Sequence, residues 1–113
     1  MNADCLFCKI VHNQIPAKMV AETESCLAFR DINPQAPVHV LVIPREHITS
    51  LDQACDAELL GKIALLGAKI ARDEGIAGSG YRVVMNNGRD GGQSVDHLHM
   101  HVLGGRRLGW PPG

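Results

Sequence analysis

The stretch His97-Leu98-His99-Met100-His101-Val102-Leu103 alternates histidine with apolar residues. This alternation predicts a β-strand over residues 97–103, because successive side chains of a strand point to opposite faces of the sheet. The three imidazoles then share one face, while Leu98, Met100 and Val102 pack into the core from the other face. Three histidines gathered on one strand face indicate a chemical or metal-binding site rather than an ordinary polar surface.

Two kinds of site fit this spacing. Histidines on one strand face can ligate a metal ion, and an imidazole can also attack an electrophile while its neighbours act as acid, base or charge stabilisers. The spacing alone does not distinguish the two. The preceding segment Asn86–Ser94 contains three glycines as well as asparagine, glutamine and serine side chains. Glycine-rich backbone can turn its N–H groups toward an anion, so this loop beside a histidine face favours a phosphate site.

The composition is that of an ordinary globular protein. The chain has 113 residues, of which 45% are hydrophobic and 20% are charged, which predicts one folded domain over residues 1–113. Its net charge of −1 provides no basic surplus for a nucleic-acid partner. No apolar run approaches the ~18 residues of a membrane span, and the N-terminal residues lack a signal-peptide pattern. We therefore expect a cytoplasmic protein without nucleic-acid or membrane partners, whose four cysteines stay reduced.

The hydrophobic pattern predicts an α+β fold. A long helix is expected over residues 56–74, where apolar residues recur at helical spacing up to Gly75. The segment Ser50-Leu51-Asp52-Gln53 matches a capping box, which predicts the start of a helix. No repeated strand–helix–strand unit is visible, which favours an antiparallel sheet. The other predicted elements are a short helix over 6–12, strands over 19–22, 26–31, 38–43 and 81–86, and a loop over 87–93.

The segment Cys5-Leu6-Phe7-Cys8 carries a second pattern, two cysteines separated by two residues. In a cytoplasmic protein this spacing indicates a zinc site or a redox motif. A thioredoxin-like role needs a strand–helix–strand context, which is missing here. A structural zinc ion would need two further ligands, for which histidine is the natural choice. Two reduced thiols packed against the core are the remaining alternative.

Several segments of the chain resemble the histidine triad (HIT) superfamily. Residues 97–103 match its motif of three histidines separated by apolar residues, and the ending Trp110-Pro111-Pro112-Gly113 is similar to the tail of its Hint branch, the histidine triad nucleotide-binding proteins. The resemblance implies an α+β fold in which one long and one short helix accompany a five-stranded antiparallel sheet. It also implies a homodimer across which the sheet continues. The other matching blocks are Phe7–Val11, Ile15-Pro16, Ala28–Ile32, Pro34–His39, Ile43-Pro44, Gly91–Ser94 and Leu103–Arg106.

The resemblance also implies a reaction, the attack of a histidine on the α-phosphorus of a nucleoside monophosphate derivative. The Hint branch typically cleaves the P–N bond of AMP-amine compounds and releases the nucleoside monophosphate, as a purine nucleoside phosphoramidase. His99, the middle histidine, would be the nucleophile and form a nucleotidyl-histidine intermediate, with His39, His101 and Ser94 as further catalytic residues. The implied substrate-binding residues are Phe29, Asp31, Ile32, Asn86, Gln93, Ser94 and Trp110, the last approaching the partner subunit's site.

For the cysteine pair, the resemblance implies a structural zinc ion that the chemistry does not require. Its ligands would be Cys5, Cys8, His47 and His97. Residues 1–16 would then form an N-terminal zinc segment, and residues 104–113 a C-terminal tail.

Three rival functions remain open at this point. The first is a dinucleoside polyphosphate hydrolase of the same fold, against which the Trp-Pro-Pro-Gly ending argues. The second is a non-catalytic nucleotide-binding or interaction module, against which the full histidine motif and Ser94 argue. The third is a catalytic metal ion on His97, His99 and His101, which predicts loss of activity in a chelator.

Overall fold

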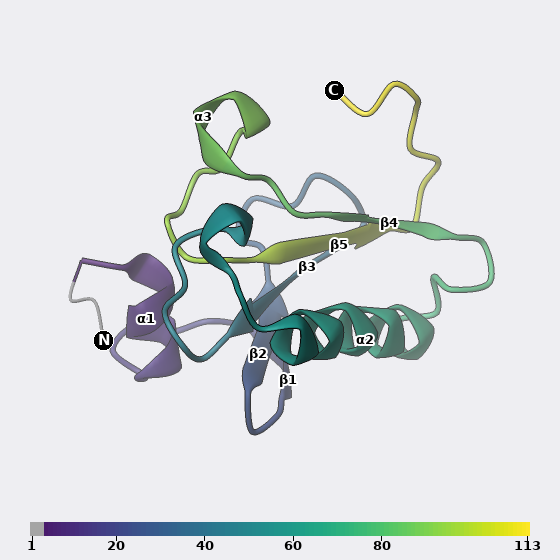
Figure 1. The fold of residues 1–113 in the computed structure, drawn as a ribbon. Helices are drawn as coiled ribbons and strands as arrows, with labels where there is room; N and C mark the ends of the chain where they lie inside the picture. Colours follow the sequence, from purple (N-terminus) through teal and green to yellow (C-terminus); the bar gives the residue numbers. More distant parts are fainter. Residues whose placement is uncertain (1–3) are drawn as a thin grey trace.

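The structure is a computed structural model that describes residues 4–113, so residues 1–3 of the predicted N-terminal zinc segment lie outside the described residues. Five strands form one antiparallel sheet in the order β1-β2-β3-β5-β4 (Figure 1). The predicted α+β fold with a five-stranded antiparallel sheet is therefore confirmed. The elements are α1 (Leu6–Val11), β1 (Met19–Glu22), β2 (Cys26–Arg30), β3 (Val38–Pro44), a 3₁₀ turn η1 (Leu51–Gln53), α2 (Ala57–Asp73), β4 (Tyr81–Val84), α3 (Gly88–Gly91) and β5 (Met100–Gly104).

Apolar side chains cover both faces of the sheet, which explains why β2 and β3 are almost continuously buried. Alternate residues of β2 and of β3 belong to two different clusters. The first cluster joins the sheet to α2 and includes Ala28, Val40, Val42, Leu59, Ile63, Ile70, Leu98, Met100 and Val102. The second cluster joins the sheet to α1 and includes Phe7, Cys8, Ile10, Leu27, Phe29, Leu41 and Ile43. A side chain on the α1 side of the sheet can thus be buried without packing in the cluster between the sheet and α2.

Helix α2 spans Ala57–Asp73, within one residue of the predicted range 56–74, but it does not begin at the capping-box pattern of residues 50–53. Asp56 caps the helix, because its carboxylate accepts a hydrogen bond from the Leu59 N–H at 3.1 Å. Ser50 instead precedes the 3₁₀ turn η1, and its side chain makes no capping hydrogen bond. The C-terminal stop at Gly75 agrees with the structure, where this residue has φ +78° after the helix.

Strand β5 also begins later than predicted, at Met100 rather than at His97. The observed register ends at the pair Val42–Met100, and continued by two residues it would place Pro44 opposite Leu98. Pro44 has no N–H to donate, so the ladder stops there. The Leu98 N–H bonds to the carbonyl of Ile48 instead, at 2.6 Å. Residues 97–99 therefore form an extended lead-in that is anchored to a loop.

The loop predicted over residues 87–93 contains a single helical turn, α3. Its glycines favour a loop over a helix, so the sequence did not predict this turn. The left-handed φ of +83° at Gly92 ends that turn. The strand predicted over 81–86 ends at Val84. Within residues 4–113, no helix is long and apolar enough to cross a bilayer.

Candidate functional site

The histidine motif presents its imidazoles and its apolar side chains to different sides of the sheet. Leu98, Met100 and Val102 pack in the α2 cluster. His97 and His99 are buried on the other side, where the ring of Phe7 from α1 meets both of them edge-on. Each face of the motif thus has its own packing partner.

His99 is held in a defined orientation by two contacts. Its Nδ1 lies 2.7 Å from the carbonyl oxygen of His97, an acceptor, so Nδ1 carries the proton and donates it. The Phe7 ring lies 5.2 Å from the His99 ring at an interplanar angle of 88°. A neutral imidazole protonated at Nδ1 leaves the lone pair of Nε2 free, which is what a nucleophilic nitrogen requires.

His39 and His101 form a direct pair of imidazoles. Strand β3 and strand β5 bring them together, and His39 Nε2 lies 2.8 Å from His101 Nδ1. Burial lowers the pKa of His101 to about 4, helped by the nearby imidazoles of His99 and His39 and opposed by Asp31. Burial also lowers the pKa of His39, although the Asp31 carboxylate, 3.5 Å from its Nε2, opposes that shift. Both rings are therefore neutral at pH 7.

A cavity of about 240 Å³ opens onto His99 and His101. Six of the residues predicted for the site line it, namely Phe29, Asp31, Ile32, Ser94, His99 and His101. The walls are mostly apolar, as is common for small-molecule sites. The polar groups come from Arg30, Asp31, Ser94 and the two histidines. The cavity thus brings together the His99 and His101 imidazoles, the Asp31 carboxylate and an apolar surface.

The sequence prediction missed one wall of this cavity, which α1 and the following loop supply. Leu6, Phe7, Ile10 and Ile15 line it, although the predicted role of residues 1–16 was zinc binding alone. Phe7 and Ile10 are three residues apart, a spacing that predicts an apolar face on the short helix. What that face covers depends on where α1 docks.

Of the other predicted site residues, His39 contacts His101 but does not line the cavity, and Asn86, Gln93 and Trp110 do not line it either. The Gln93 side chain binds backbone instead: its amide donates to the carbonyls of Thr49 and Val95, and its oxygen accepts from the Gly88 N–H. Trp110 is 82% exposed in the tail. The roles predicted for Asn86, Gln93 and Trp110 remain predictions.

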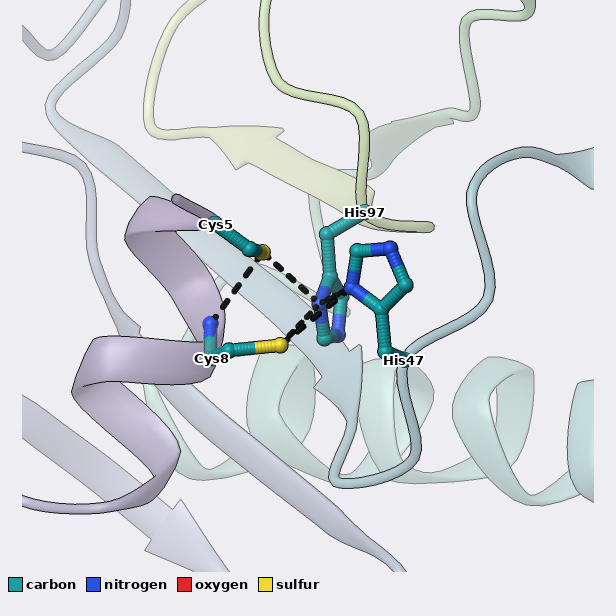
Figure 2. A group of neighbouring side chains, drawn as sticks. All are labelled: Cys5, Cys8, His47 and His97. Carbon is teal, nitrogen blue, oxygen red and sulfur yellow. Dashed lines mark hydrogen bonds between the residues drawn. The ribbon is translucent and has the colours of Figure 1, made fainter. Parts of the chain in front are cut away.

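A second cluster lies behind the histidine motif (Figure 2). Four side chains point toward one another: Cys5 at the N-cap of α1, Cys8 within α1, His47 from the loop after β3, and His97 before β5. Their potential ligand atoms all lie within 4.8 Å of one another. The shortest separations are 3.2 Å between His47 Nδ1 and His97 Nδ1, 3.2 Å between Cys8 Sγ and His47 Nδ1, and 3.3 Å between Cys5 Sγ and His97 Nδ1.

These separations fit a tetrahedral metal ion. Zn–N bonds of about 2.0 Å and Zn–S bonds of about 2.3 Å place neighbouring ligand atoms roughly 3.3–3.8 Å apart in a tetrahedron. Two sulfurs and two imidazole nitrogens are also a common structural zinc set. The second nitrogen of His97 lies 2.9 Å from the Pro44 carbonyl, which orients the ring as an outer-shell partner does. The four predicted residues therefore form a group that could hold a metal ion.

The three histidines of the motif, by contrast, do not form such a group among the described residues. The other close set of potential ligands is Asp31, His39 and His101. His39 and His101 hydrogen-bond to each other in it, and Gln35 occupies the remaining ring nitrogen of His39. The Cys/His group that could hold a metal ion is therefore distinct from the pair of hydrogen-bonded imidazoles, His39 and His101.

His97 belongs to both clusters. Its imidazole contributes Nδ1 to the Cys/His group, while its backbone carbonyl accepts the proton of His99 Nδ1. Burial lowers the pKa of the His97 imidazole, which keeps a ligand nitrogen unprotonated. One residue thus joins a metal-type site to the candidate nucleophile.

Comparison with known proteins gives a consistent result. The HIT domain model matches residues 12–108 of this chain. A relative from Synechococcus elongatus, named an uncharacterized HIT-like protein, is 52% identical over 115 residues and covers all of both chains. The crystal structure of a HIT family hydrolase from Legionella pneumophila is 50% identical, with a TM-score of 0.95 over 97% of this chain and 100% of that one. A histidine triad protein from Clostridium difficile is 43% identical, with a TM-score of 0.93 over 96% of each chain.

Proposed function

This chain belongs to the HIT domain family, and on this premise we propose that it is a purine nucleoside phosphoramidase of the Hint branch. Its structural neighbours include proteins described as HIT family hydrolases. The single observation that carries the proposal is the hydrogen bond from His99 Nδ1 to the His97 carbonyl, 2.7 Å long. It leaves His99 Nε2 free as a nucleophile in a ring that lines the cavity.

In the proposed reaction, His99 Nε2 attacks the α-phosphorus of an AMP-amine compound. The P–N bond breaks, and the amine leaves with a proton that the Ser94 hydroxyl passes on from water. The hydroxide left by that water then attacks the phosphorus of the nucleotidyl-histidine, the P–N bond to His99 breaks, and AMP is released together with neutral His99. The lowered pKa values of His39 and His101 support a neutral imidazole cluster rather than a cationic one.

The cavity suggests how the nucleotide would bind. Phe29 and Ile32 would contact the base through apolar surface, and Ile32 is 97% exposed, so it has contacts to gain. Asp31 would accept hydrogen bonds from the ribose hydroxyls. Its Oδ1 already accepts from the Asn33 N–H at 2.8 Å, which orients the carboxylate. Asn86, Gln93 and Ser94 are the proposed phosphate-side residues.

We also propose a homodimer with a sheet that continues between the subunits. Trp110 would then approach the partner subunit's site, for which its exposure in this chain leaves it available. Apolar side chains on α2 and β4 are exposed in the single chain, which supports a surface that a second subunit would cover. These residues are Leu65, Tyr81 and Val83.

The Cys/His cluster is proposed to bind a structural Zn²⁺ ion through Cys5, Cys8, His47 and His97. The tetrahedral separations and the donor set support this assignment. When bound, the ion would fix α1 against the lead-in to β5. Both cysteines must be reduced to bind it, which supports the cytoplasm as the proposed location.

The test is to incubate the zinc-loaded protein with adenosine 5′-phosphoramidate and measure AMP release. We expect turnover in wild type, none in His99→Ala, and turnover that survives brief chelation of the folded protein. Loss of activity on chelation without unfolding would move the metal ion into the chemistry. Binding of AMP without turnover would favour a non-catalytic module, and turnover of diadenosine polyphosphate alone would favour the polyphosphate hydrolase.

A further inference from the structure

We infer that the backbone N–H of Gln35, supported by Arg106, is a positioning group that fixes the protons on His39 and His101. The inference deepens the proposed function and rests on it, because it explains how His101 would meet the phosphate. Neither Gln35 nor Arg106 lines the cavity. Both would therefore act through the histidine pair rather than on the substrate.

The first step is the proton on His39. The Gln35 N–H points at His39 Nδ1, 3.0 Å away. A backbone N–H can only donate, so this nitrogen must be an unprotonated acceptor. A neutral imidazole then carries its single hydrogen on Nε2. The burial of His39, which is 5% exposed, disfavours the cation that would otherwise place hydrogens on both nitrogens.

The second step passes this assignment to His101. His39 Nε2 lies 2.8 Å from His101 Nδ1 and 3.5 Å from Asp31 Oδ2. Since His39 Nε2 carries the hydrogen, it donates to His101 Nδ1 in the shorter contact, and His101 must carry its own hydrogen on Nε2. Protonation of His101 would bring two N–H groups face to face across 2.8 Å.

The result is that His99 and His101, neighbours on one sheet face, hold opposite tautomers. His99 has its hydrogen on Nδ1, bonded to the His97 carbonyl, and exposes a lone pair at Nε2. His101 has its hydrogen on Nε2. Both rings line the cavity, with centroids 5.1 Å apart. One ring can attack phosphorus while the other donates a hydrogen bond to a phosphoryl oxygen, where a lone pair would repel the negative charge.

The Gln35 N–H is itself held by the loop between β2 and β3. Pro34 and Pro37 restrict the backbone on either side of it. The Gln35 side-chain amide donates to the Asn33 carbonyl at 2.9 Å. The Arg106 guanidinium donates to the Gln35 carbonyl from Nη2 at 3.0 Å and from Nε at 3.3 Å. Arg106 thus ties the end of β5 to the residue that orients His39.

The direct test is ¹⁵N NMR of the zinc-loaded full chain labelled at histidine, at pH 7.5, where ring-nitrogen shifts report the tautomer. Gln35→Pro removes the N–H, and Gln35→Ala is the matched variant that keeps it. In wild type and Gln35→Ala we expect the hydrogen on Nε2 of His39 and His101 and on Nδ1 of His99. In Gln35→Pro, His39 and His101 should show mixed tautomers while His99 stays unchanged. A wild-type His101 protonated at Nδ1, or unchanged tautomers in folded Gln35→Pro, overturns the inference.

Arg106→Ala provides a second test that does not depend on a new proline being tolerated. We expect partial loss of the fixed tautomers and a roughly tenfold lower kcat on adenosine phosphoramidate with KM changed less than twofold, because a misdirected donor affects the transition state most. Arg106→Lys, which keeps a donor, should recover part of the kcat. An Arg106→Ala variant with wild-type tautomers and kcat overturns the role of Arg106. If wild type has no phosphoramidase activity, the proposed function fails, but the NMR result still decides the tautomer assignment.

Discussion

The ring of Phe7 stands edge-on against the ring of His99, with centroids 5.2 Å apart and an interplanar angle of 88°. In the sequence, Phe7 stands between the two cysteines of the candidate metal site, and the residue is 4% exposed. It also contacts the rings of Phe29 and His97. The short helix that supplies two potential zinc ligands therefore also supplies the packing partner of the candidate nucleophile.

Replacement of Phe7 by alanine should weaken both folding and activity. The lost ring leaves a cavity in the α1 cluster, for which we expect a loss of about 3 kcal/mol in unfolding free energy. His99 would also lose a contact that restricts its ring, so kcat should fall about tenfold. Urea unfolding and AMP-release kinetics measure the two effects.

The matched control is Phe7→Leu, which keeps most of the volume and removes the aromatic edge. It should retain most of the stability and still show a lower kcat. Equal kcat values for Phe7→Leu and wild type would mean that the aromatic contact does not position His99.

Loss of a zinc ligand should destabilise the protein. Cys8 is 2% exposed, and its sulfur lies 3.2 Å from His47 Nδ1. We expect Cys8→Ser to bind less than one zinc ion per chain and to lose more than about 2 kcal/mol of stability, because metal binding is linked to folding. Elemental analysis and thermal unfolding with and without chelator check this. Cys55→Ser, at an exposed cysteine, is the control and should match wild type in both measurements.

The buried histidines make stability depend on pH. The pKa of His101 is lowered from 6.5 to about 4, chiefly by burial. The unfolded chain therefore binds a proton between these values that the folded protein does not, and stability falls as pH drops from 6.5 to 4. His101 should contribute at most about 3 kcal/mol to this loss.

Urea unfolding at pH 7.5 and at pH 4.5 measures the difference for wild type and His101→Gln. The variant should lose less stability than wild type on acidification. A loss as large as in wild type would show that His101 titrates normally in the folded protein.

Gly105 packs closely against Pro37, and a larger residue at position 105 should disrupt this contact. Its φ is +88°, and an added Cβ would lie 2.9 Å from Pro37 Cβ. We expect Gly105→Ala to cost about 1–3 kcal/mol and to lower kcat, because the clash moves the loop that orients His39. Gly78→Ala is the control, since nothing lies within 4 Å of its added Cβ and its φ is not positive. A stability change equal to that of the control would sink this prediction.

Local patterns in the sequence predicted most of the helices and strands and the chemical types of the site residues. Side-chain periodicity predicted the long helix and the central strand, because a helix or strand that buries one face repeats its apolar residues at a fixed spacing. The short turn α3 and the start of β5 escaped this reasoning. The first is too brief to show a period, and the second depends on Pro44 of β3, which has no N–H to continue the ladder.

By itself, the sequence determined the alternating histidines, the cysteine pair and the two-faced pattern of the strands. Only the tertiary structure decided which of these groups meet. His39 and His101 are 62 positions apart, and Cys5 and His97 are 92 positions apart, so no local spacing relates them. The antiparallel register of β3 with β5 and the docking of α1 bring them together. Proton positions, ligand geometry and the wall behind His99 follow from those long-range contacts, because hydrogen bonds and packing depend on distances in space rather than along the chain.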